Sequence, residues 1–244
     1  MPPNPSYDVL IVGAGMSGLC SLHQIRQRLP EWRVKVIDSA ADVGGTWFWN
    51  RYPGCRVDSE SVSYGFSFDK ELLEEWHWKE TFSSQPELLR YLRRFAEKHD
   101  LLKDIAFDTT IKSARWDDSF WTLVDDSGRE YTSTFLISCV GFLSTPTLPA
   151  IPGIETFDGQ AFHTSRWPAD LEPGRDFAGK RIGVIGTGAT GIQTITTLSK
   201  EPLIKSLTVF QRTANWGVPI RNSEITSQQM AEYRKQYGAI FQQC

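Results

Sequence analysis

Two glycine-rich turns constrain the fold of this 244-residue sequence more than any other feature. The first runs from Gly13 to Gly18 and the second from Gly186 to Gly191, and both have the spacing G-x-G-x-x-G. Each follows a short, β-branched apolar run and precedes a stretch with helical periodicity. Glycines in this position let the backbone turn tightly and approach a pyrophosphate, and the helix start offers free N–H groups. We therefore predict an α/β protein with two Rossmann-like dinucleotide-binding domains.

The two turns differ in the residue that follows the next strand. The strand predicted from Arg33 to Asp38 ends on a carboxylate, which accepts hydrogen bonds from ribose hydroxyls and repels a 2′-phosphate. The strand predicted from Leu207 to Phe210 is followed by Arg212, whose guanidinium can bind a 2′-phosphate through two hydrogen bonds. We therefore expect FAD or NAD at the first turn and NADP at the second. Arg212 could alternatively be a solvated surface charge.

Periodicity and proline content predict how these domains follow one another. Apolar residues recur at helical spacing in 16–29, 70–78, 86–99 and 189–198, and the tail 223–244 is also helical in pattern. A proline-rich stretch near residue 148 marks a domain boundary. We therefore expect a first domain at 1–148 and a second at 149–244. The second β-α-β unit has only just closed where the sequence stops, so we expect this domain to be incomplete.

Two further segments belong to the first domain. Residues 44–58 combine glycine, proline and aromatic side chains with neither helical nor strand spacing, so we expect a long ordered loop. From about 105 to 140 the apolar residues alternate with polar ones, which predicts a small antiparallel β meander. Its last apolar stretch, 135–141, should rejoin the parallel sheet.

Composition excludes several classes of protein. The net charge of −3 lacks the basic footprint of a nucleic-acid binder. The N-terminus has no basic region, and its apolar run, 9–12, is too short for a signal peptide or a membrane span. The four cysteines contain no C-x-x-C pair, so we expect neither a metal site nor a disulfide framework. A reducing, cytoplasmic setting follows as the default.

The segment 157–168, FDGQAFHTSRWP, lies between the two turns and would join the two nucleotide-binding domains. Its His163 could act as a general base, because the unperturbed pKa of histidine lies near neutrality. We favour the alternative, a packing or hinge residue that couples the domains. His23, His77 and His99 lie in helical patterns and are expected to be surface or packing residues.

The same segment resembles the fingerprint of the type I Baeyer–Villiger monooxygenases, flavoproteins that convert ketones into esters or lactones. Its fixed positions are Phe157, Gly159, His163, Trp167 and Pro168. Residues 44–61 and 211–216 resemble that family as well, so the resemblance covers nearly the whole chain. The flavin-containing monooxygenases that oxidise amines and sulfides have a similar fingerprint without the Trp-Pro ending. The run Ser138-Cys-Val-Gly141 departs from the family, which usually reads Ala-Thr-Gly there.

The resemblance implies FAD at the first turn and NADPH at the second. For FAD it implies Gly13, Gly15, Ser17 and Gly18 at the pyrophosphate, Asp38 at the ribose, Thr46, Trp47, Trp49, Asp58 and Tyr64 around the flavin, and the Ile111 backbone at the adenine end. For NADPH it implies Gly186, Thr187, Gly188, Thr190, Gly191 and Gln193 at the pyrophosphate, Arg212 and Thr213 at the 2′-phosphate, and Arg56 near the nicotinamide.

The activity implied by the resemblance inserts one oxygen of O2 beside a ketone carbonyl through a C4a-peroxyflavin. The family stabilises this peroxide with an arginine oriented by an aspartate. Asp58 matches the aspartate, whereas the arginine belongs to a later part of the family's sequence. We therefore expect a fragment that needs a missing C-terminal segment or a partner chain and has little activity alone. The alternatives are N- or S-oxygenation, or a non-catalytic protein that binds FAD and NADP.

Overall fold

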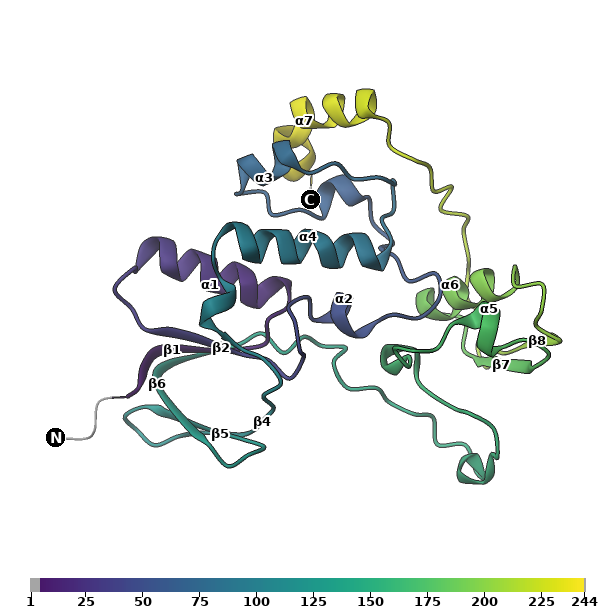
Figure 1. Cartoon of the computed structure of the whole chain (residues 1–244), viewed down its shortest axis with the longest axis horizontal. Coiled ribbons are helices and arrows are strands. Elements are labelled where there is room, and N and C mark those ends of the chain that lie inside the picture. The colour runs from purple at the N-terminus through teal and green to yellow at the C-terminus, as the bar shows by residue number, and fades with distance from the viewer. Residues whose placement is uncertain (1–4, 244) are drawn as a thin grey trace. The chain divides into compact units, whose positions relative to one another are not determined.

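The computed structural model describes residues 5–243 (Figure 1). Its contacts divide the chain into two compact units. The first unit comprises Met1–Trp49 and Leu89–Thr147, and the second comprises Asn50–Leu88 and Leu148–Cys244. The segment 50–88 thus belongs to the same unit as the C-terminal part of the chain.

The first unit contains a six-stranded sheet with the order β3-β2-β1-β6-β5-β4. Its strands are β1 (Tyr7–Val12), β2 (Val34–Ile37), β3 (Ile105–Ala106), β4 (Ile111–Trp116), β5 (Trp121–Asp125) and β6 (Glu130–Ser138). Strand β6 pairs parallel with β1, in the register Val9↔Phe135, and antiparallel with β5. The prediction that the end of the meander rejoins the parallel sheet is confirmed.

The prediction that the antiparallel meander begins at about residue 105 was wrong. Strand β3 pairs parallel with β2, with Val36 opposite Ile105, so it belongs to the parallel part of the sheet. The antiparallel part begins only at β4. Two residues are too short a stretch for alternation to reveal the direction of pairing.

The core of the first unit forms where apolar strand residues meet helix α1 (Met16–Arg28). Leu10 and Ile11 of β1 and Leu19 and Leu22 of α1 are fully buried. Figure 1 shows α1 running along the sheet beside β1 and β2. Helix α4 (Gln85–Lys98) adds Phe95, whose ring centroid lies 5.4 Å from that of His23 in α1. The predicted helices at 16–29 and 86–99 are therefore confirmed to within one or two residues.

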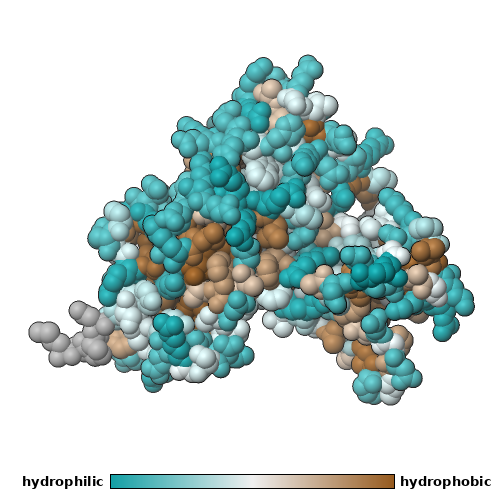
Figure 2. Space-filling view, in the orientation of Figure 1, coloured by the Kyte–Doolittle hydropathy of each residue, from teal (hydrophilic) through white to brown (hydrophobic). Residues whose placement is uncertain are grey.

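The second unit contains the two-stranded parallel sheet of β7 (Arg181–Ile185) and β8 (Ser206–Phe210). Helix α6 (Ala189–Leu198) connects them and has the predicted bounds. The short helix α5 (Pro173–Asp176) precedes β7. Figure 2 shows hydrophobic side chains at the surface between wide hydrophilic areas, and both strands carry exposed apolar residues, including Ile185 and Phe210.

Helix α7 (Ser227–Gln242) lies beside α3 (Lys70–Glu75) in this unit (Figure 1). The tail was predicted to be helical from residue 223, but the helix begins only after Thr226. The Thr226 side chain accepts from the Gln229 N–H, and Gln229 Oε1 accepts from the Thr226 N–H at 2.9 Å, which is a capping box. Before it, the Ile225 N–H donates to the Lys79 carbonyl at 2.8 Å, so this segment is extended.

Three other sequence expectations need correction. Residues 44–58 were expected to lack regular structure, yet α2 (Thr46–Trp49) forms one helical turn within them. Helix α3 ends at Glu75 rather than near residue 78, because Trp76 has an extended backbone (ψ 134°). His77 is therefore not helical, and its Nε2 lies 3.0 Å from the Ile225 carbonyl oxygen.

The remaining regular elements are single 3-10 turns. They are η1 (Ser61–Ser63), η2 (Leu102–Asp104), η3 (Ile154–Thr156) and η4 (Thr164–Arg166). No helix within residues 5–243 has the length and apolar character that crossing a membrane requires.

Candidate dinucleotide sites

The first glycine turn, between β1 and α1, has a tightly folded backbone. Gly13 has a φ of +107°, which a residue with a side chain rarely adopts. A Cβ on Gly18 would lie 1.8 Å from the Gly13 carbonyl oxygen, so the turn and the helix touch through backbone atoms. Helix α1 is preceded by Gly15, which has no side chain to cap the helix. The first N–H groups of α1 are therefore available to an anion such as a pyrophosphate.

Asp38 lies at the end of β2 and is 8% exposed. Its Oδ2 accepts from the Ala14 N–H inside the glycine turn, and its Oδ1 accepts from the Ala40 N–H at 2.7 Å. The carboxylate thus ties the turn to the strand end, a role that the sequence analysis missed. Each oxygen of an ionised carboxylate can accept a further hydrogen bond, so Asp38 has acceptor positions left for a ribose hydroxyl.

A second pair of glycines lies against this turn. A Cβ on Gly45 would lie 2.9 Å from the Gly15 Cα, and the Gly44 N–H donates to the Ala14 carbonyl at 3.0 Å. Helix α2 follows directly, so Thr46 and the aromatic residues behind it start beside the turn. Trp47 is buried. The rings of Trp49 and Phe48 meet edge-on, with their centroids 5.1 Å apart. The structure thus brings Thr46, Trp47 and Trp49 together with the first turn.

The other residues predicted around FAD belong to different elements of the chain. Ile111 begins β4 in the first unit, and its side chain packs on the buried cluster that contains Leu10 and Leu123. Asp58 and Tyr64 belong to the second unit. Asp58 is exposed, and Tyr64 follows η1 with its N–H donated to the Ser61 carbonyl at 2.9 Å.

The second turn, between β7 and α6, repeats the geometry of the first. Gly186 has a φ of +101°, and a Cβ on Gly191 would lie 2.5 Å from the Gly186 carbonyl oxygen. Gly188 precedes α6, and a Cβ added there would meet no atom within 4 Å. The space beside the Gly188 backbone is therefore open, as the approach of a pyrophosphate requires.

The chain that follows β8 folds back onto this turn. Gln211 Nε2 donates to Thr187 Oγ1 at 2.6 Å, and Asn215 Nδ2 donates to the Thr187 carbonyl at 3.2 Å. Arg212 and Thr213 lie between these two residues and are exposed. The structure therefore brings the predicted 2′-phosphate residues to the predicted pyrophosphate turn.

A loop from early in the chain also contacts α6. The Tyr52 hydroxyl lies 2.8 Å from Gln193 Oε1 and 3.4 Å from Thr190 Oγ1, and the Arg56 backbone hydrogen-bonds the Gln193 amide. Burial raises the pKa of Tyr52, so its hydroxyl stays neutral and can donate. Tyr52 was not predicted from the sequence as a site residue, because nothing in the local pattern relates it to a helix far along the chain.

The Arg56 guanidinium has partners of its own. Its Nη1 donates to the Phe82 carbonyl at 3.3 Å and lies 3.7 Å from Glu80 Oε2. Burial raises the pKa of the neighbouring Cys55 thiol to about 11, so this cysteine is a poor nucleophile at neutral pH.

The fingerprint segment is held together by local packing. Trp167 is buried. Its ring centroid lies 4.8 Å from that of Phe162 and 5.9 Å from that of Phe177. His163 Nδ1 lies 2.8 Å from Ser165 Oγ and accepts from the Ser165 N–H, so the ring caps η4. A Cβ on Gly159 would collide with the Phe157 ring at 2.5 Å, and Pro168 follows the buried Trp167.

Two other features lie apart from the predicted site residues. A pocket of about 310 Å³ between α3 and α7 is lined by Lys70, Leu73, Arg234 and Phe241 among others, none of which the sequence analysis assigned to a cofactor. Within the described residues, no group of His, Cys, Asp or Glu side chains has the arrangement of a metal site.

Two β-turn-α units with glycine turns of matching geometry define an α/β dinucleotide-binding protein, as predicted. The chain belongs to the flavin-binding monooxygenase-like family, whose model matches residues 6–226. The resemblance found in the sequence is therefore confirmed.

Three relatives show the range within this family. The chain is 44% identical to 2-oxo-Delta(3)-4,5,5-trimethylcyclopentenylacetyl-CoA monooxygenase of Pseudomonas putida, over 98% of this chain and 44% of the relative. It is 42% identical to cyclohexanone 1,2-monooxygenase of an Acinetobacter species, over 100% of this chain and 44% of that relative. It is 44% identical to the phenazine N-monooxygenase PhzNO1 of Lysobacter antibioticus, over 96% of this chain and 42% of that relative.

Solved structures agree with these relationships. The crystal structure of OTEMO in complex with FAD and NADP matches with a TM-score of 0.90 at 44% identity, over 97% of this chain and 45% of that one. A closed crystal structure of cyclohexanone monooxygenase matches with a TM-score of 0.90 at 39% identity, over 99% of this chain and 44% of that one. This chain thus spans less than half the length of the relatives it matches.

Proposed function

We propose that these residues form the FAD-binding and NADPH-binding parts of a flavoprotein monooxygenase that oxygenates ketones. One observation carries this proposal: two glycine turns with the same backbone geometry lead to Asp38 in one unit and to Arg212 in the other. A carboxylate suits a ribose without a 2′-phosphate, and a guanidinium suits a 2′-phosphate. The two units therefore favour different dinucleotides.

In the first unit, the residues fit FAD. The N–H groups after Gly15 would bind its pyrophosphate, with Gly13, Ser17 and Gly18 shaping the turn, and Asp38 would accept from the ribose hydroxyls. Thr46, Trp47 and Trp49 of α2 would line the flavin, and the Ile111 backbone would face the adenine end. Bound FAD supplies hydride acceptance from NADPH and, after reduction, reaction with O2.

In the second unit, the residues fit NADPH. The turn from Gly186 to Gly191, with Thr187, Gly188 and Thr190, would bind the pyrophosphate at the start of α6. Arg212 and Thr213 would bind the 2′-phosphate, since Gln211 and Asn215 hold their segment against the turn. Arg56 would add a positive charge toward the nicotinamide end.

Asp58 and Tyr64 are proposed to contact the flavin from their own segment. The backbone before Asp58 is fixed, because the Val57 N–H donates to the Ser83 carbonyl at 3.1 Å. Asp58 itself is exposed and thus accessible to a partner. We propose that Asp58 orients an arginine that is not among these residues, as the family resemblance implies. A cytoplasmic location agrees with the free thiols of Cys20, Cys55 and Cys139.

N-oxygenation is the second candidate function, and one observation favours it. The phenazine N-monooxygenase is 44% identical to this chain, the same value as for the monooxygenase of Pseudomonas putida. Sequence identity therefore does not separate a carbonyl substrate from an aromatic nitrogen. Product analysis with a cyclic ketone and with a phenazine, on a protein that continues through the rest of the relatives' length, separates the two candidates.

The cofactor proposal is tested on the 244-residue protein. We expect it to purify with a flavin absorption spectrum, and heat release should yield FAD. Anaerobic NADPH should then bleach that spectrum, because a hydride has passed to the flavin. A colourless protein that fails to bind added FAD contradicts the proposal. A flavin spectrum that NADPH leaves unchanged contradicts a productive arrangement of the two cofactors in these residues.

A further inference from the structure

Gln193 in α6 uses its side-chain amide to hold the loop of residues 52–56. Its Oε1 accepts from the Tyr52 hydroxyl at 2.8 Å and from the Arg56 N–H at 3.3 Å. Its Nε2 donates to the Arg56 carbonyl oxygen at 3.2 Å. A glutamine amide has two acceptor positions on oxygen and two N–H donors. Both acceptor positions and one donor are thus committed to the loop, which leaves a single N–H for any other partner.

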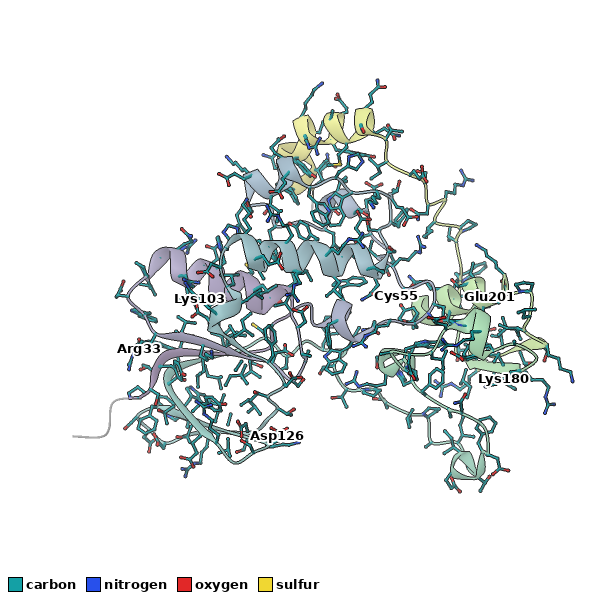
Figure 3. All side chains as sticks on the ribbon, in the orientation of Figure 1. Arg33, Cys55, Lys103, Asp126, Lys180 and Glu201 are labelled. Carbon is teal, nitrogen blue, oxygen red and sulfur yellow. The ribbon has the colours of Figure 1, made fainter. Side chains whose placement is uncertain are left out.

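The backbone of the same loop packs directly on α6. A Cβ on Gly54 would lie 2.2 Å from Thr197 Oγ1 and 2.7 Å from the Gln193 carbonyl oxygen, so only glycine fits at this contact. Cys55 lies beside α6 (Figure 3), and its carbonyl oxygen accepts from the Gln85 N–H at 2.8 Å. The loop is therefore held from two sides, by α6 and by the start of α4.

Arg56 is the charged residue that this arrangement places. Gln193 binds both backbone polar groups of Arg56, and the guanidinium is held separately by the Phe82 carbonyl and Glu80. Tyr52 extends the contact to the first turn of α6, where its hydroxyl lies 3.4 Å from Thr190 Oγ1. The loop thus connects a cation to the helix that begins at the second glycine turn.

We propose that Gln193 is a positioning residue: it fastens the loop of residues 52–56 to α6 and so fixes Arg56 for the nucleotide, rather than binding the nucleotide itself. This inference rests on the proposed function, in which α6 receives NADPH. The role predicted for Gln193 from the sequence was a pyrophosphate ligand. A ligand for phosphate oxygens must donate hydrogen bonds, and most of this amide already faces the loop.

The first test measures the loop without any nucleotide. Gln193→Met keeps the side-chain length but removes the amide, which leaves the buried Tyr52 hydroxyl and the Arg56 backbone without these partners. In hydrogen-exchange mass spectrometry we expect the Arg56 amide to exchange about tenfold faster. The Val57 amide, which donates to Ser83, should change little. Gln236→Met, the same change at an exposed position of α7, is the matched control.

The second test separates positioning from direct binding. Gln193→Glu keeps the acceptors for Tyr52 and Arg56 but places a carboxylate where a phosphate ligand would need a donor. If Gln193 positions the loop, NADP+ affinity by calorimetry should fall in the order wild type, Gln193→Glu, Gln193→Met, and the Arg56 exchange rate should rise in that order. If Gln193 binds the pyrophosphate, Gln193→Glu should have the weakest affinity, because like charges repel.

The exchange result decides whether Gln193 holds the loop independently of the proposed function, and the affinity result decides between positioning and direct binding. An unchanged Arg56 exchange rate in Gln193→Met overturns it, and so does an NADP+ affinity lower in Gln193→Glu than in Gln193→Met. If the wild-type protein binds no NADP+, the proposed function fails, while the exchange measurement still decides whether Gln193 holds the loop.

Discussion

Asp38 serves the fold before it serves any ligand. Its carboxylate accepts the N–H of Ala14 inside the first glycine turn and the N–H of Ala40 beyond β2. The residue that would recognise a ribose is therefore held in place by the turn that would bind the pyrophosphate. Hydrogen bonds to a charged acceptor are stronger than neutral ones, so this position is well fixed.

This arrangement predicts the effect of Asp38→Asn. An amide keeps the size but puts an NH2 group toward one of the two backbone donors, so the turn should shift and the ribose should lose a charged acceptor. We expect FAD to bind about ten- to a hundredfold more weakly in a flavin fluorescence titration. Asp8→Asn, which removes the ion-pair partner of Arg33 in the same unit, should leave FAD affinity unchanged. Equal losses in both variants contradict the assignment.

At the scale of elements, the glycines of the second turn have separate roles. Gly191 packs against the Gly186 carbonyl, whereas Gly188 borders open space. We expect Gly191→Ala to lower the free energy of unfolding by about 1–3 kcal/mol, because the turn must shift. Gly188→Ala should change it by less than about 1 kcal/mol. Yet Gly188→Ala should weaken NADP+ binding at least about tenfold, because its methyl group fills the approach to the helix start.

Calorimetry and denaturant titration of both variants measure these effects. Unchanged NADP+ affinity in Gly188→Ala means that the nucleotide lies elsewhere.

The hairpin between β5 and β6 is expected to depend on pH through Asp125. Its pKa is held below the usual value, first by the Ser127 hydroxyl and then by the Arg129 N–H and the Tyr131 hydroxyl. A carboxylate with a lowered pKa stabilises the fold above its unfolded-state pKa, and this contribution is lost as the pH falls through the folded-state value. We expect Asp125→Asn to lower the melting temperature by several degrees at pH 7.

As the pH falls below the lowered folded-state pKa of Asp125, the difference between Asp125→Asn and the wild type should shrink, because the carboxyl group is then protonated in both states of the wild type. Asp126→Asn at the adjacent turn position (Figure 3) is the control and should have little effect at either pH. A difference that stays constant with pH shows that the charge of Asp125 does not stabilise the hairpin.

How far the sequence predicts this protein depends on the range of the interactions. The bounds of α6 and nearly those of α1 follow from apolar spacing and the glycine turns, because both signals are local. The contact of Tyr52 with Gln193 joins residues 141 positions apart, and no local pattern contains it. The same holds for Asp38, whose predicted ribose role needed only its place after a strand, while its hydrogen bond to Ala14 needed the folded turn.

At the scale of the whole molecule, the chain matches only part of the length of its relatives. The chain spans 44% of the cyclohexanone monooxygenase that it matches. The arginine that Asp58 would orient is not identified among these residues. We expect the 244-residue protein to form less than about 1% of the ester that a full-length relative forms from cyclohexanone, since losing one charge-stabilising group alone costs about a hundredfold or more. Gas chromatography with NADPH in excess measures the product, and robust ester formation contradicts this expectation.

The central claim is that the two turns accept different dinucleotides, and Arg212 tests it most directly. Calorimetric titration with NADP+ and with NAD+ should show that the wild-type protein binds NADP+ more tightly. Arg212→Ala should weaken NADP+ binding about ten- to a hundredfold and leave NAD+ binding unchanged. Arg181→Ala, an exposed arginine on β7, should change neither affinity. Equal affinity of the wild type for both nucleotides, or an equal loss of both in Arg212→Ala, would contradict the claim.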